Sequence, residues 1–179
     1  VEVHEVFLDD ALKLKEHGNQ KGQLHRINRF SEEETKSLRE LMECSHPDWE
    51  VLFHLYHDRK MNPMSFLKSE QFLNILTESC LEKYPYIAFA DAFHTMRSML
   101  LPVLYLLGSE VPLADTYHAI STGYGGLLAC LGGYVYRRPV LLTEHGIYTR
   151  EREEEIIRAK WVIPSFKKQW ISFFYMLSE

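Results

Sequence analysis

Hydrophobic residues recur at intervals of three and four between residues 30 and 107, which is the spacing of amphipathic helices. A capping box at Ser31 and Glu34 opens the first predicted helix, and Leu38 and Leu41 lie on its apolar side. Because proline is favoured in the first turn of a helix, we predict a second helix that starts at Pro47.

Two longer helices are predicted further along the chain. One starts at Asn62-Pro63 and ends at the break Tyr84-Pro85, with an apolar side formed by Phe66, Leu73, Leu76 and Cys80. The other runs from about Ile87 to Leu107, is kinked before Pro102 and is ended by Gly108.

The first residues show a different pattern. Val1 to Leu8 begins in β-branched alternation and predicts a strand, and Asp9-Asp10 then open a short polar helix. Residues 18–29 contain glycine, asparagine and basic residues without periodicity, and they predict a loop.

After residue 110 the pattern becomes strand, glycine turn, helix, strand, helix. Residues 114–122 and 140–145 are the two predicted strands; Gly123 to Gly126 form the turn, and a charged helix covers residues 149–160. This order is typical of a parallel sheet covered by helices. We therefore predict an α/β fold, a partial Rossmann-like parallel sheet with a large helical portion, with residues 1–110 mainly helical and residues 111–179 forming the βαβα part.

Composition narrows the function classes. With 46% hydrophobic and 25% charged residues among 179, the chain is neither collagen-like nor disordered. Its net charge of -5 gives no positive field for nucleic acid, so we expect no nucleic-acid partner. Three widely spaced cysteines, Cys44, Cys80 and Cys130, form no metal or disulfide pattern and predict a reducing, cytoplasmic setting.

The candidate binding site lies at the predicted strand ends, because ligands of open α/β sheets bind beyond the carboxyl ends of the strands. Glycines there let backbone amides approach ligand oxygens, and a helix N-terminus favours negative charge. Two arginines of the charged helix can present planar forks to a phosphate or carboxylate. The predicted substrate-binding residues are His118, Ser121, Thr122, Gly123, Gly125, Gly126, Tyr148, Arg150 and Arg152. Glu144 and His145 are the predicted catalytic residues.

Each of these features has an alternative explanation. The glycine turn is not a GxGxxG motif, and taken alone it is better explained as a tight turn with close packing of the helix. His145 can be a buried imidazole bonded to a carbonyl, and the run from Arg150 to Glu155 can be a solvated helix face. His118, Glu144 and His145 form no HExxH-type spacing, so we predict no metal site.

Two segments carry a resemblance to a known family: Asp115 to Leu127 (DTYHAISTGYGGL) and Pro139 to Arg152 (PVLLTEHGIYTRER). Together they resemble the PelF-type glycosyltransferases, which are retaining family-4 enzymes with two Rossmann-like lobes in the GT-B architecture. The resemblance is strongest over residues 111–179, and Val1 to Leu8 also resembles the family's amino-terminal lobe.

The resemblance implies that residues 1–179 are part of the acceptor-side lobe of an enzyme that transfers sugar from a UDP-sugar to a growing exopolysaccharide. No cofactor is implied, and the donor-binding lobe is not in this sequence, so the fragment alone is expected to be inactive. His145 and Glu144 are the implied catalytic positions near the reacting sugar, and His118 with Gly123 to Gly126 is implied to line the same cleft.

Two other functions remain open at this stage. One is a non-catalytic module whose Met- and Phe-rich helices dock a membrane-associated polysaccharide synthesis complex. The other is a metal-dependent hydrolase that uses His118, Glu144 and His145. We also predict self-association of the chain through exposed hydrophobic faces.

Overall fold

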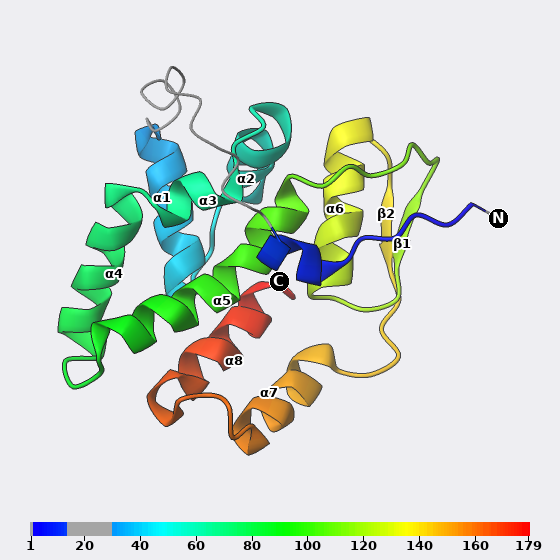
Figure 1. The fold of residues 1–179 in the computed structure, drawn as a ribbon. Helices are drawn as coiled ribbons and strands as arrows, with labels where there is room; N and C mark the ends of the chain where they lie inside the picture. Colours follow the sequence, from blue (N-terminus) through cyan, green and yellow to red (C-terminus); the bar gives the residue numbers. More distant parts are fainter. Residues whose placement is uncertain (1, 14–29) are drawn as a thin grey trace.

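The computed structural model describes residues 2–13 and 30–179 (Figure 1). The predicted loop at residues 18–29 and the start of the predicted first strand, Val1, lie outside these residues. The regular elements are α1 (Glu32–Glu43), α2 (Trp49–Phe53), α3 (Pro63–Leu67), α4 (Glu70–Lys83), α5 (Phe89–Leu107), β1 (Tyr117–Ala119), α6 (Tyr124–Tyr136), β2 (Val140–Leu142), α7 (Tyr148–Arg158) and α8 (Lys167–Met176).

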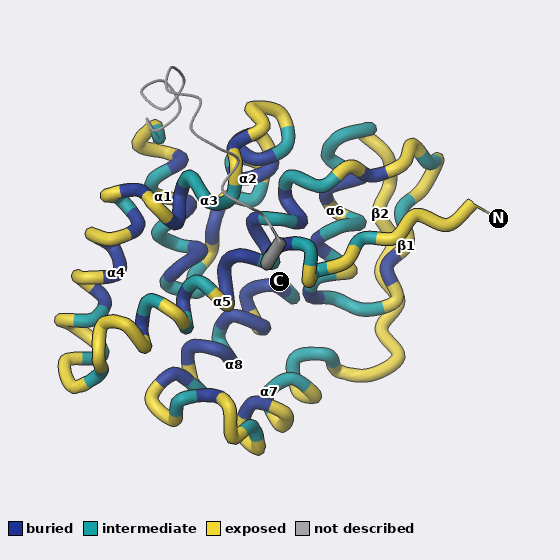
Figure 2. The backbone as a smooth tube through the Cα atoms, in the orientation of Figure 1, coloured by how far each residue is buried: buried dark blue, intermediate teal, exposed yellow. Residues whose placement is uncertain are grey.

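Helix α5 is the centre of the molecule. It lies between α1 to α4 on one side and the strands with α6 on the other, and most residues of its second half are buried (Figures 1 and 2). Pro102 lies inside the helix and Gly108 follows its end, as predicted, although the first helical residue is Phe89 rather than Ile87. Leu100, Leu104 and Leu107 are at most 1% exposed, so the apolar run from Met99 to Leu107 belongs to the core.

Local caps determine where the first helices begin. The capping box is present: Glu34 N donates to Ser31 Oγ at 3.1 Å, and Ser31 N donates to Glu34 Oε2 at 2.8 Å. The prediction for Pro47 was wrong in position. Asp48 is the N-cap of α2, because its Oδ1 accepts from Val51 N at 3.2 Å, and Pro47 lies just before the cap.

The single helix predicted from Asn62 to Tyr84 is two helices. Asn62 caps α3 and Pro63 occupies its first turn, as predicted. Ser69 then interrupts the run, because its hydroxyl accepts from Phe72 N at 3.1 Å and donates to Phe66 O at 2.7 Å. A serine side chain that bonds the backbone in this way ends one helix and starts the next.

The predicted strand at the start of the chain was also wrong for the described residues 2–7. They form no strand, and Leu8–Lys13 is a short 3₁₀ helix that begins near the predicted polar helix. Alternating hydrophobic residues alone do not form a strand, because the backbone N–H and C=O groups of a strand need hydrogen bonds to a neighbouring strand. No such neighbour stands beside residues 2–7 in the described part of the chain.

The fold class is confirmed: the chain is α/β, mostly helical, with a small parallel sheet consistent with a partial Rossmann-like fragment. Strand β1 pairs in parallel with β2, and Tyr117, His118 and Ala119 stand opposite Val140, Leu141 and Leu142. Helix α6 connects the strands and packs against them through two glycines: a Cβ at Gly132 would lie 2.5 Å from the Tyr117 ring, and one at Gly133 would lie 2.4 Å from Val140.

The predicted division at residue 110 separates the helices up to α5 from the part that contains both strands. The two parts share one hydrophobic core, since Leu127, Ile156 and Phe173 belong to the same cluster as the residues of α5. Among the described residues, no helix has both the length and the apolar character needed to cross a membrane.

Candidate functional site

The candidate site lies at the carboxyl ends of β1 and β2, which point to the same edge because the strands are parallel. Two side-chain hydrogen bonds join the segments that leave the strands. His118 Nε2 and Thr143 Oγ1 are 2.9 Å apart, and Thr122 Oγ1 donates to Glu144 Oε1 at 3.0 Å. The residues predicted from the two strand ends are therefore neighbours in the structure.

The glycine turn brings the chain sharply from β1 into α6. Gly123 has φ 72° and ψ −138°, and a Cβ there would lie 2.4 Å from Cζ of Tyr148. Glycine is needed at this position both for the positive φ and for the close ring. Gly125 and Gly126 follow in the first turn of α6, where their Cβ positions would meet only Ser121 atoms at 3.9 and 3.5 Å.

The N-terminus of α6 is not capped by a side chain. The first amides of a helix have no partner within the helix, and its dipole concentrates partial positive charge there. Ser121 and Thr122 lie beside this turn and are half-buried. The turn can therefore hold a ligand oxygen of partial or full negative charge, such as a sugar hydroxyl or a phosphate.

An aromatic cluster supports the site from the side of α7 and α8. The Arg152 guanidinium lies 5.2 Å from the Tyr148 ring centroid and 5.8 Å from that of Phe174. Phe174 also contacts the rings of Tyr124 at 6.4 Å and Tyr148 at 6.1 Å. Burial raises the pKa of Tyr124 and of Tyr148, so both phenols stay neutral at physiological pH.

The segment from Thr143 to Ile147 is exposed along its whole length. His145 makes no hydrogen bond or ion pair with the other described residues, so the buried, carbonyl-bonded alternative does not apply to it. Its imidazole is free to accept from or donate to a ligand. Glu144, by contrast, is held in place by Thr122.

The comparisons assign the chain to a family. The sequence matches the family described as "Domain of unknown function (DUF3492)" over residues 1–179. The chain belongs to this family. No curated protein and no solved structure matches it. The DUF3492 description names no activity, so the resemblance to PelF-type enzymes remains a prediction.

The structure places the two arginines of this DUF3492 chain differently. Arg150 is exposed near the start of α7. Arg152 is half-buried over the aromatic rings and donates to Glu155 Oε2 at 2.5 Å, so part of its donor capacity is already used. Of the two, Arg150 has the fork that is free for an anionic ligand.

Sequence reasoning missed the contribution of Tyr124 and Phe174. Tyr124 follows the turn glycine directly, and Phe174 belongs to the run Trp170, Phe173, Phe174, whose spacing of three and one fits one face of a helix. No helix is predicted in this run from the sequence. This spacing is the signal that could have predicted α8 as an amphipathic helix with an aromatic face.

In the described ranges, no group of three or more His, Cys, Asp and Glu side chains is arranged to hold a metal ion. The two candidate ligands His118 and Glu144 are instead bonded to Thr143 and Thr122. The metal-hydrolase alternative therefore has no supporting geometry among these residues.

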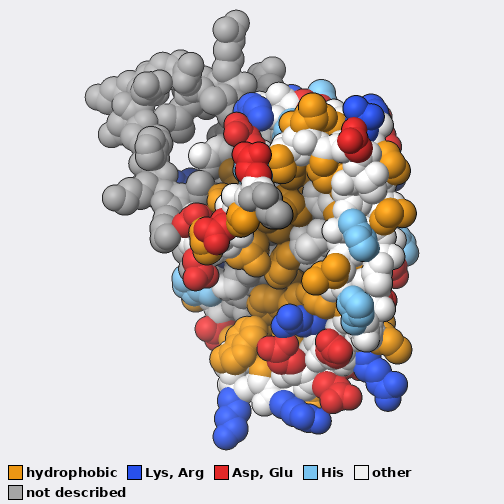
Figure 3. Space-filling model, turned by 90° about the vertical axis from the view of Figure 1, so that its right-hand side faces the viewer, with side chains coloured by type: hydrophobic (Ala, Val, Ile, Leu, Met, Phe, Trp, Pro, Cys, Tyr) orange, Lys and Arg blue, Asp and Glu red, His pale blue; other side chains and the backbone are white. Residues whose placement is uncertain are grey.

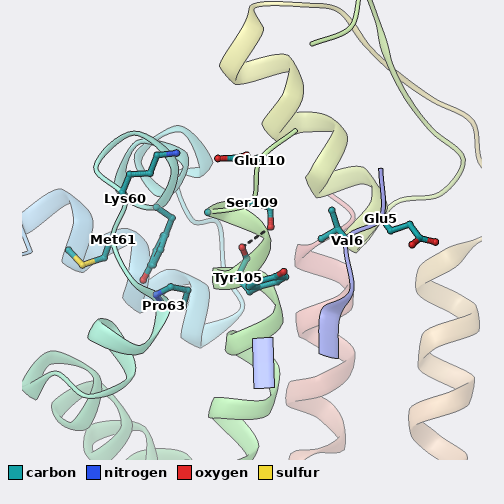
Figure 4. A pocket seen from close by; sticks show the side chains of 10 residues that line it. Glu5, Val6, Lys60, Met61, Pro63, Tyr105, Ser109 and Glu110 are labelled. Atoms are coloured by element: carbon teal, nitrogen blue, oxygen red, sulfur yellow. Dashed lines mark hydrogen bonds between the residues drawn. The ribbon is translucent and has the colours of Figure 1, made fainter. Parts of the chain in front are cut away.

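A hollow of the surface lies away from the strand ends. A cavity of about 420 Å³ opens between residues 5–6, the segment after α2 and the end of α5 (Figure 4). Glu5, Lys60 and Glu110 line its charged parts, and Ser109 Oγ donates to Tyr105 O at 3.0 Å on its wall. No strand-end residue lines this cavity, so it is separate from the candidate site.

Proposed function

We propose that this chain forms the acceptor side of a retaining glycosyltransferase that transfers a sugar from a UDP-sugar to a growing exopolysaccharide. The main support is the clustering of the family-like residues. The bonds from His118 to Thr143 and from Thr122 to Glu144 join the two segments that resemble PelF-type enzymes, and they do so beside the glycine turn.

The proposed roles follow from the geometry. The exposed imidazole of His145 binds a sugar hydroxyl at the reacting end, because it is a donor or acceptor that other described residues leave free. Glu144, fixed by Thr122, orients the segment that carries His145. The uncapped amides of α6 and the half-buried Ser121 hold further oxygens of the acceptor.

The diphosphate leaving group needs positive partners in the transition state. In this proposal Arg150 and the positive end of α6 supply part of this positive charge. Most contacts to the UDP-sugar come from residues outside 1–179. The chain by itself is then a binding unit that does not complete a catalytic cycle.

The alternative of a docking module based on the Met- and Phe-rich helices gains no support from those side chains. Met96, Met99, Phe66 and Phe72 are at most 3% exposed and belong to the core. They are therefore not available to a partner without unfolding of the helices.

A binding experiment on this chain tests the proposal. Saturation-transfer NMR with cello- and chito-oligosaccharides, and separately with UDP, is expected to show oligosaccharide binding that is stronger than binding of UDP. His145→Ala should weaken the oligosaccharide by about 10-fold, the equivalent of one hydrogen bond of about 1.4 kcal/mol.

His94→Ala is the matched control, because His94 is an exposed histidine on α5, far along the chain from the strand ends. Absence of binding to every oligosaccharide, or binding that His145→Ala and His94→Ala change equally, would contradict the proposal.

A further inference from the structure

Strand β2 is an open, hydrophobic edge. Val140, Leu141 and Leu142 are 39%, 55% and 51% exposed, although strands of parallel sheets are normally covered. Figure 3 shows hydrophobic side chains and histidines on the side of the molecule that carries the strands. Among the described residues, only β1 pairs with β2. An uncovered edge of this kind is a template for pairing with another strand.

The backbone of β2 shows which groups are free to pair. Tyr117 N donates to Pro139 O at 3.0 Å, and Thr143 N donates to Ala119 O at 2.9 Å. Because neighbouring residues of a strand turn their backbone groups to opposite sides, Pro139, Leu141 and Thr143 face β1. Val140 and Leu142 therefore turn their amides and carbonyls to the open edge. Pro139, which has no amide hydrogen, does not interrupt that edge.

We propose that β2 pairs antiparallel with β2 of a second copy of this chain, about a twofold axis at Leu141. Val140 then stands opposite Leu142 of the second copy, and both residues have their backbone groups on the correct side to exchange two hydrogen bonds. Leu141 meets its own counterpart in a non-hydrogen-bonded pair, where side chains approach most closely. The two small sheets become one sheet of four strands.

Charge favours a second copy as the occupant. In this register Arg138 stands opposite Glu144 of the second copy, three residues on either side of Leu141, and the twofold axis repeats the pair. Both side chains are exposed. Glu144 uses Oε1 for Thr122, which leaves Oε2 for a guanidinium. The segment Arg138-Pro-Val-Leu-Leu-Thr-Glu144 is thus complementary to itself only when antiparallel.

This pairing concerns the sheet edge and holds whatever ligand the strand ends bind. Light scattering and analytical ultracentrifugation over a concentration series should show a dimer of the wild-type chain. Arg138→Glu and Glu144→Arg each place like charges opposite one another twice, and each should weaken the dimer by about 10-fold or more. An equimolar mixture of the two variants restores both opposite-charge pairs, so it should form a heterodimer.

Arg137→Glu is the matched control: Arg137 is exposed and adjacent, and it lies outside the proposed pairs, so the dimer should persist. Hydrogen exchange of the wild-type chain tests the pairing without any substitution. The Val140 and Leu142 amides should exchange more slowly at high protein concentration than at low concentration. A monomer at every concentration, a dimer that Arg138→Glu and Arg137→Glu affect equally, or two variants that do not associate when mixed would overturn the proposal.

Discussion

At the scale of single residues, the candidate site depends on the absence of one side chain. Gly123 has a positive φ, and the Tyr148 ring occupies the space where a Cβ would project. The same residue therefore starts α6 and lets Tyr148 of α7 pack against the turn after β1. The sequence indicated a turn here, but it did not show that an aromatic ring 25 positions later would fill the gap, because that contact depends on how α7 packs.

Replacement of Gly123 by alanine should destabilise the fold by about 2–3 kcal/mol, because it combines left-handed backbone strain with a clash against Tyr148. Gly125→Ala is the matched control, since its Cβ would lie 3.9 Å from the nearest atom, Ser121 Oγ, and alanine favours a helix by up to about 1 kcal/mol. Urea unfolding measures both. Equal urea midpoints for the two variants would mean that packing of the Tyr148 ring does not require glycine at position 123.

At the scale of elements, local side-chain signals located most helices, and the errors arose where two signals competed. Ser31, Asn62 and Gly108 marked helix ends correctly. The continuous hydrophobic spacing through Phe66 and Leu73 concealed the cap at Ser69. Strands were harder to predict, because pairing decides them: residues 2–7 alternate and form no strand, whereas β1 and β2 stabilise each other.

The break between α3 and α4 depends on one buried hydroxyl. Ser69 is 3% exposed, and its Oγ both accepts from Phe72 N and donates to Phe66 O. Ser69→Ala should cost about 1–2 kcal/mol, because it leaves the first turn of α4 without its cap and the Phe66 carbonyl without this donor. Thermal unfolding followed by circular dichroism gives the difference.

Ser65→Ala serves as the control for that substitution, since Ser65 lies in α3 and its hydroxyl makes no hydrogen bond with the other described residues. A loss of stability as large as that of Ser69→Ala would show that α3 responds to any shortened side chain.

At the scale of the whole molecule, a polar contact joins segments that are far apart in sequence. Gln169 of α8 is 8% exposed, and its Nε2 donates to Met42 O at 2.8 Å at the end of α1. Tyr84 OH donates to Gln169 Oε1 at 3.3 Å, and Cys44 Sγ lies 3.1 Å from Nε2. One side chain thus holds α8, which supports the aromatic side of the candidate site, against the helices of the first half.

Cys44 reports on this junction, because burial raises the pKa of its thiol to about 12 and keeps it unreactive near neutral pH. Gln169→Leu should destabilise the fold by about 2–3 kcal/mol, since it removes the amide donor to the Met42 carbonyl and the acceptor of the Tyr84 hydroxyl. Opening of the junction should then increase alkylation of Cys44, measured site by site by mass spectrometry. Lys168→Ala, an exposed neighbour on the same helix, should leave both quantities unchanged. If Gln169→Leu lowers stability while Cys44 stays protected, the contact supports the core without controlling whether α8 separates from α1.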